Sequence, residues 1–152
     1  VGVGALSLLI VAGPLLGIVA IKLLRRRARR RKSDPELQIT GGWDEYVDTS
    51  VDLGRPTPGT LTRQEVAALY GEVDPHSQGL ALATMADRSV FDSSEPTATD
   101  STAFWQIVDT ERHRLIANTG WWRKLRARIS LRSLARHSRF ARPRRKGKNA
   151  SR

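Results

Sequence analysis

The first 24 residues, VGVGALSLLIVAGPLLGIVAIKLL (1–24), decide the fold class because they contain no charged residue before Lys22. A helix rises about 1.5 Å per residue and the hydrocarbon core of a bilayer is about 30 Å thick, so roughly 20 apolar residues can span it. We expect residues 1–24 to form a transmembrane helix, with the Lys22 ammonium reaching the interface. A cleaved signal peptide is the alternative, but that would need a basic region before the apolar run.

A run of eight basic residues and no acid follows, from Lys22 to Lys32. Basic residues next to a membrane span favour the cytoplasmic side, and anionic lipids attract them. We therefore expect a cell-membrane protein whose soluble part is cytoplasmic, with anionic headgroups of the bilayer as partner. The residues predicted to contact the membrane surface are Lys22, Arg25, Arg26, Arg27, Arg29, Arg30, Arg31 and Lys32, together with Trp121 and Trp122 further along the chain.

The spacing Gly13-Pro14-Leu15-Leu16-Gly17 permits close approach of a second helix. Small residues are common in spanning helices, so ordinary composition is the simpler explanation. A chain that opens on Val1 with an apolar helix is also expected to be part of a longer protein, with further spanning helices as partners.

The middle of the chain is acidic, since all 15 acidic residues lie between Ser33 and Glu111. We expect a basic juxtamembrane linker over 25–42 and then a small helical domain over 43–120. Trp43 and Tyr46 open its first helix, and Thr62-Arg63-Gln64-Glu65 is a capping box that begins the second. Asp74-Pro75 is predicted to begin the third, and a fourth carries Phe104, Val108 and Leu115 on one face.

The C-terminal region is strongly basic, with 15 Lys and Arg residues and no acid after Glu111. A basic amphipathic helix is expected over 121–138, with Trp121, Trp122, Leu125 and Ile129 on one face. That face could lie on the membrane surface or complete the core of the domain, and the sequence favours neither. Residues 139–152 are expected to be a disordered basic tail, for which lipid, acidic proteins and nucleic acid are all possible partners.

Catalytic chemistry is not expected in this chain, and no cofactor or metal site is predicted. The chain has no cysteine, and this absence excludes disulfide scaffolds and Cys nucleophiles. It has three histidines. Asp109 and His113 are four residues apart, which favours an ion pair on a helix. Asp74, His76 and Ser77 are nearly adjacent and suit a helix cap better than a catalytic triad.

Several short motifs resemble the C-terminal end of actinobacterial transglutaminase-like membrane proteins. They are an apolar helix, an Arg-rich run, Trp43-Asp44-Glu45-Tyr46, Arg55-Pro56-Thr57-Pro58-Gly59-Thr60, Ala86-Asp87-Arg88-Ser89-Val90-Phe91, Trp122-Arg123-Lys124-Leu125-Arg126-Ala127-Arg128-Ile129-Ser130 and Arg132-Ser133-Leu134. The resemblance implies that spanning helices and an extracytoplasmic papain-like domain lie upstream, and that this chain is the last spanning helix with a cytoplasmic helical domain. The family's Cys-His-Asp set has no counterpart here.

Two functions follow as hypotheses. The preferred one is a non-catalytic membrane anchor and cytoplasmic interaction module of a larger transglutaminase-like membrane protein. The alternative is a membrane-tethered nucleic-acid-binding protein that uses the basic C-terminal tail, whose binding would weaken steeply with salt.

Overall fold

A computed structural model describes residues 2–55, 57–132 and 135–136 of the chain, with side chains from residue 12 onward apart from those of 123 and 128. This part of the chain is all-helical, which confirms the predicted all-α class. The basic tail predicted over 139–152 lies outside the described residues. The described residues form the helices α1 (Gly2–Arg30), α2 (Pro35–Asp52), α3 (Arg63–Val73), α4 (Gly79–Phe91), α5 (Ala98–Ala117) and α6 (Trp121–Ile129).

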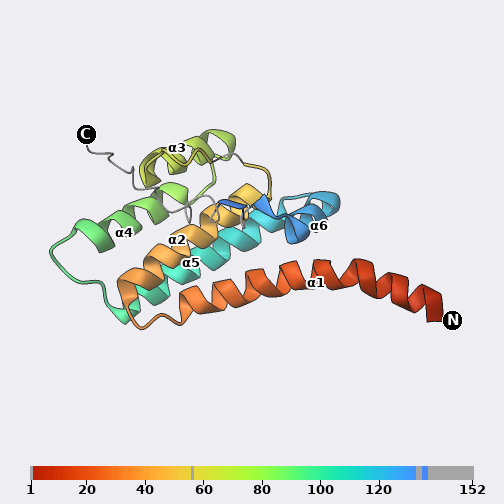
Figure 1. Ribbon diagram of the computed structural model, residues 1–152. Helices are drawn as coiled ribbons and strands as arrows, with labels where there is room; N and C mark the ends of the chain where they lie inside the picture. The colour runs from red at the N-terminus through yellow and green to blue at the C-terminus, as the bar shows by residue number, and fades with distance from the viewer. Residues whose placement is uncertain (1, 56, 133–134, 137–152) are drawn as a thin grey trace, which may run out of the picture.

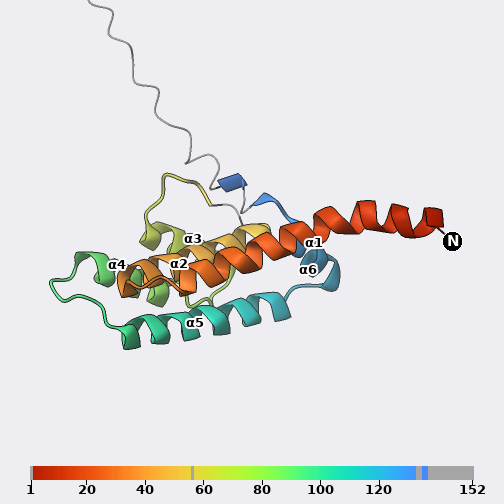
Figure 2. The ribbon, with the colours of Figure 1, turned by 60° about the horizontal axis from the view of Figure 1, so that its bottom comes forward.

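The helices pack around a central pair formed by α2 and α5, which lie side by side (Figure 1). Helices α3 and α4 pack against each other and cover one side of this pair through α4. Helix α1 runs back along α2 in the opposite direction, and its N-terminal part extends beyond the other helices (Figures 1 and 2). Helix α6 contacts α1 and α2 near the point where α1 leaves the bundle.

The exposed part of α1 carries large apolar side chains, among them Leu16, which is 68% exposed, and Leu24. Such residues occur singly on most protein surfaces, but here they follow one another on a helix that leaves the bundle. Among the described residues, no helix combines the length and the apolar character that crossing a membrane requires.

The linker expected over 25–42 is mostly helical, because α1 continues to Arg30 and α2 begins at Pro35. Asp34 is the N-cap of α2 and accepts a hydrogen bond from the Glu36 N–H at 2.9 Å. Proline suits the first position of a helix because it lacks an N–H that would remain unpaired there. The expected helix start at Trp43 was therefore eight residues too late.

The capping box at the start of α3 is confirmed: the Thr62 hydroxyl accepts from the Glu65 N–H, and the Glu65 carboxylate accepts from the Thr62 N–H. Helix α3 continues to Val73. The start expected at Asp74-Pro75 was wrong, because Asp74 caps the C-terminal end of α3. Helix α4 begins only at Gly79.

Helix α5 begins with a second capping box, in which Thr97 and Asp100 exchange side-chain and backbone hydrogen bonds. Its predicted inward residues Phe104, Val108 and Leu115 are all buried. They join a single core cluster with residues of α2, α3 and α4. The buried members include Trp43, Tyr46, Val66, Tyr70, Leu82, Ala86 and Trp105.

Two neighbouring glycines let α2 approach α1 and α5 closely. A Cβ at Gly42 would lie 2.8 Å from the Phe104 ring, and a Cβ at Gly41 would lie 3.0 Å from the Arg29 Cβ. Real side chains do not fit such distances without movement of the neighbour. The Gly-Gly pair that the sequence analysis assigned to a linker therefore marks a helix contact.

Candidate functional site

Acidic side chains form one stripe on α2 and continue onto α5. Glu45, Asp48 and Asp52 follow one another at intervals of three and four residues, which places them along one side of α2. Asp109 of α5 completes the set. We call these four residues the acidic face. They lie opposite α1, which packs directly on α2.

Four residues of the basic run 22–32 bind the acidic face, namely Lys22, Arg26, Arg29 and Arg30, and we call them the basic face of α1. Lys22 Nζ lies 2.7 Å from the Asp52 carboxylate. Arg26 pairs with Asp109 and, at 3.7 Å, with Glu45. The helix is thus held to the bundle over more than two turns.

Arg29 is the centre of this interface and is only 8% exposed. Its guanidinium donates to the Asp48 carboxylate at 2.8 Å and to that of Glu45 at 3.2 Å. Arg30 pairs with Asp109, and its guanidinium carbon lies 4.7 Å from the centre of the Trp105 ring. Cations are attracted to the face of an aromatic ring, so Trp105 adds to the contact.

Burial raises the pKa of Glu45, and the positive charges of Arg29, Arg26 and Arg112 act against this rise. Arg112 of α5 lies 3.8 Å from the Glu45 carboxylate, so arginines from both neighbouring helices reach it. The surrounding cations compensate part of the desolvation cost of the carboxylate. A buried ion pair that loses one partner leaves an uncompensated charge, which makes this interface sensitive to single substitutions.

The other predicted membrane-contact residues of the run lie elsewhere on α1 or just after its end at Arg30. Arg25 is half-buried, whereas Arg27, Arg31 and Lys32 are exposed. The structure therefore divides the run into one part that binds the acidic face and one part that is accessible to a partner. The predicted contact with the membrane surface covered the whole run and did not include this pairing. The matching spacing of bases and acids was the signal that could have revealed it.

Trp121 and Trp122 are both 63% exposed on α6, and their ring centres are 3.7 Å apart. Leu125 on the same helix is also exposed. The alternative that these residues complete the core is therefore wrong. Helix α6 is linked to α1 because the Lys22 ammonium donates to the Ala127 carbonyl oxygen at 2.9 Å. The exposed tryptophans lie on a helix that contacts α1 at the first charged residue after its apolar stretch.

The two candidate catalytic or metal-binding constellations serve structural contacts. The Asp109 carboxylate binds arginines of α1, while the His113 ring nitrogen Nδ1 contacts the Asp109 carbonyl oxygen at 2.8 Å, so the expected ion pair is not made. The Ser77 hydroxyl binds the Tyr46 hydroxyl at 2.9 Å. Among the described residues, no three His, Cys, Asp or Glu side chains are grouped to hold a metal ion.

Asp74 belongs to a partly buried charge network between the helices. Arg114 of α5 makes two hydrogen bonds to the Asp74 carboxylate, at 2.7 and 3.2 Å, and Arg55 makes a third at 3.1 Å. These hydrogen bonds, those from Arg114 first, lower the pKa of Asp74 to about 2. Arg114 also binds the fully buried Glu111, the one charged residue on the inward face of α5.

Comparison of the chain with protein-family models, with curated proteins and with solved structures found no match.

Proposed function

We propose that this chain is the membrane anchor and cytoplasmic interaction module of a larger transglutaminase-like membrane protein and is itself non-catalytic. The observation that carries the proposal is the continuity of α1. One helix joins an uncharged apolar stretch, which extends past the bundle, to a basic segment fixed on the acidic face.

The side chains at the point where α1 leaves the bundle support a membrane surface at that level. Leu16 and Leu24 are exposed on α1, and Trp121 and Trp122 are exposed on the adjacent α6. Tryptophan is enriched at membrane interfaces, where the ring is partly buried and its N–H stays close to water. Lys22 lies between these groups and begins the basic run.

The transglutaminase-like parent is supported by the motif resemblance alone. In that family the catalytic domain precedes the last spanning helix, so the reading frame upstream of residue 1 is the direct test. An upstream domain that carries Cys, His and Asp between spanning helices would agree with the proposal. An upstream region without spanning helices would contradict it.

Membrane association can be tested by fractionation of a tagged full-length chain. The variant Leu15→Arg/Leu16→Arg places two charges on the exposed apolar part of α1, each costing about 2.5–3.5 kcal/mol at the centre of a membrane span. Val73→Arg/Leu80→Arg is the matched control, because both residues are large, apolar and exposed on other helices. We expect the first variant to leave the membrane fraction and the control to remain in it.

Orientation can be tested by labelling, because the chain has no native cysteine. Ser93→Cys lies in the exposed connection between α4 and α5, and Gly2→Cys lies at the other end of α1. A membrane-impermeant maleimide is expected to label Gly2→Cys in intact cells and Ser93→Cys only after permeabilisation. Labelling of Ser93→Cys in intact cells would contradict the cytoplasmic location of the bundle.

A further inference from the structure

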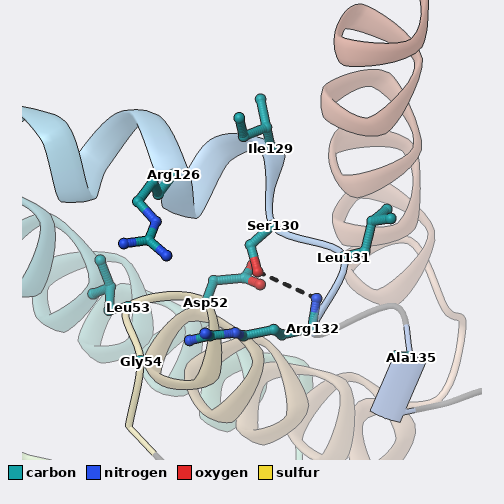
Figure 3. Close-up of a pocket in the computed structure, with 9 residues that line it drawn as sticks. All are labelled: Asp52, Leu53, Gly54, Arg126, Ile129, Ser130, Leu131, Arg132 and Ala135. Carbon is teal, nitrogen blue, oxygen red and sulfur yellow. Dashed lines mark hydrogen bonds between the residues drawn. The ribbon is translucent and has the colours of Figure 1, made fainter.

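An open cavity of about 710 Å³ lies beside the junction of α1 and α6 (Figure 3). The end of α2, helix α6 and the segment that follows α6 form its walls. The lining includes Leu53 and Gly54 after α2, Arg126 and Ile129 of α6, and Leu131 and Arg132 beyond it. Its size is that of a small-molecule site.

Two arginines provide the positive charge of the cavity. Figure 3 shows the Arg126 and Arg132 side chains extending from different walls toward the end where Leu53 and Gly54 lie. Nη1 of Arg132 would lie 3.7 Å from a Cβ placed on Gly54, so its guanidinium is held close to this turn. Within the described part of the chain, neither arginine has an acidic residue within ion-pair distance.

The one acidic residue in the wall is already paired. The Asp52 carboxylate lies 2.7 Å from Lys22 Nζ, and Lys22 also binds the Ala127 carbonyl oxygen of α6. Lys22 thus compensates the negative charge of Asp52. The guanidinium groups of Arg126 and Arg132 remain available for an anion. Arginine binds phosphate oxygens through parallel charge-assisted hydrogen bonds, which makes phosphate the anion that best matches the pair.

Leu53, Ile129 and Leu131 form an apolar part of the lining, and Ser130 adds a hydroxyl group. A free phosphate ion would leave the apolar side chains without a partner, whereas a phospholipid would place its glycerol and first acyl carbons against them. The cavity also lies next to Lys22, where the apolar stretch of α1 ends. Basic pockets beside membrane spans are known sites for lipid headgroups.

We propose that this cavity binds the phosphate headgroup of an anionic phospholipid, with Arg126 and Arg132 as the phosphate-binding residues. The lipid as the source of the phosphate rests on the proposed membrane location of α1. The bound lipid would join α6 and the end of α2 to the membrane at the exit of α1.

Calorimetric titration of the full chain in dodecyl maltoside micelles tests the site. The probes are dihexanoyl phosphatidylglycerol, dihexanoyl phosphatidylcholine and inorganic phosphate. We expect phosphatidylglycerol to bind at least tenfold more tightly than either other probe. The variant Arg126→Gln/Arg132→Gln is expected to lose about tenfold or more in affinity, since each charge-assisted contact contributes on this scale.

Arg27→Gln/Arg31→Gln is the matched control, because it removes the same charge from exposed positions in α1 and directly after it. We expect it to change the affinity by less than about twofold, given that exposed charges contribute little to a specific site. Equal affinity for the two lipids, or equal losses in the two double variants, would overturn the proposal. Inorganic phosphate binding as tightly as phosphatidylglycerol would overturn the lipid as source.

Fractionation separates this proposal from the membrane role. Arg126→Gln/Arg132→Gln keeps α1 intact and is expected to remain in the membrane fraction. Recovery of the unmodified chain as a soluble protein would contradict the membrane role and the lipid source together. A membrane-bound chain that does not distinguish the two lipids would contradict the cavity proposal alone.

Discussion

Replacement of Arg29 by methionine tests whether ion pairs hold α1 to the bundle. Methionine keeps an unbranched apolar stem against Gly41 and removes the charge, so the packing changes little. The carboxylates of Asp48 and Glu45, at 2.8 and 3.2 Å from the guanidinium, lose their nearest cation. Removing one partner of a buried pair costs about 3–5 kcal/mol.

The lower end of that range applies because other arginines remain near both carboxylates. Arg136 lies 3.4 Å from Asp48, and Arg26 and Arg112 lie within 4 Å of Glu45. We therefore expect Arg29→Met to lower the free energy of unfolding by about 3 kcal/mol. Arg27→Met, on an exposed position of the same helix, is expected to change it by less than about 0.5 kcal/mol.

Urea titration of the full chain in detergent micelles measures both variants, with fluorescence of the buried Trp43 and Trp105 as the signal. The variant Arg29→Met/Asp48→Asn serves as a second check. It should be more stable than Arg29→Met alone, since it removes one buried carboxylate that has lost its ion pair with Arg29. Equal midpoints for Arg29→Met and Arg27→Met would refute the interpretation that Arg29 fixes α1.

Two further predictions concern the bundle itself. Gly42→Ala is expected to destabilise the protein by about 1–3 kcal/mol, because the new Cβ would meet the buried Phe104 ring at 2.8 Å, whereas Gly71→Ala, with open space around its Cβ, should stabilise α3 by about 0.5–1 kcal/mol. Denaturant titration of the two variants checks the opposite signs, and a stabilising Gly42→Ala would contradict the close contact. The Asp74 pKa is depressed from its ordinary value of 3.8 to about 2, so its stabilisation is present above pH 3.8 and is lost as the pH falls through about 2. Between pH 4 and pH 2, the free energy of unfolding should therefore fall by about 1 kcal/mol less in Asp74→Asn than in the unmodified chain. Equal falls in acid titrations of the two proteins would show that Arg114 does not hold this carboxylate.

Helix starts defined by neighbouring residues could be predicted from the sequence. The capping box of Thr62 and Glu65 involves side chains only three residues apart, so its signal is complete in the local sequence. The inward face of α5 was predicted for the same reason, since Phe104 and Val108 recur with the helical period.

Features that depend on distant residues were missed. The Gly41-Gly42 pair has the composition of a linker, yet it lies inside α2. There it makes room for the close approach of α1 and α5. Asp74 precedes a proline and resembles an N-cap, but Arg114, 40 residues away, binds its carboxylate. Neither partner can be identified from the local sequence.

The candidate site was predicted only in part. The basic run and the exposed tryptophans were identified, because charge and amphipathic pattern are properties of a single segment. The acidic partners were missed because each stripe was considered alone, although Lys22, Arg26 and Arg29 repeat with nearly the same period as Glu45, Asp48 and Asp52. The matching spacing of the basic residues of α1 and the acidic residues of α2 is the signal that indicates their contact.

The one-sided pairing of α1 couples the helix mechanically to the bundle. Successive residues of an α-helix are rotated by about 100°, so turning α1 by a single residue would move its whole basic face away from the acidic face. Lys22, Arg26 and Arg29 would lose their partners together, and α6 would lose its hydrogen bond from Lys22. A rotation of α1 would therefore have to break all of these ion pairs at once, and it would act on α6 through Lys22.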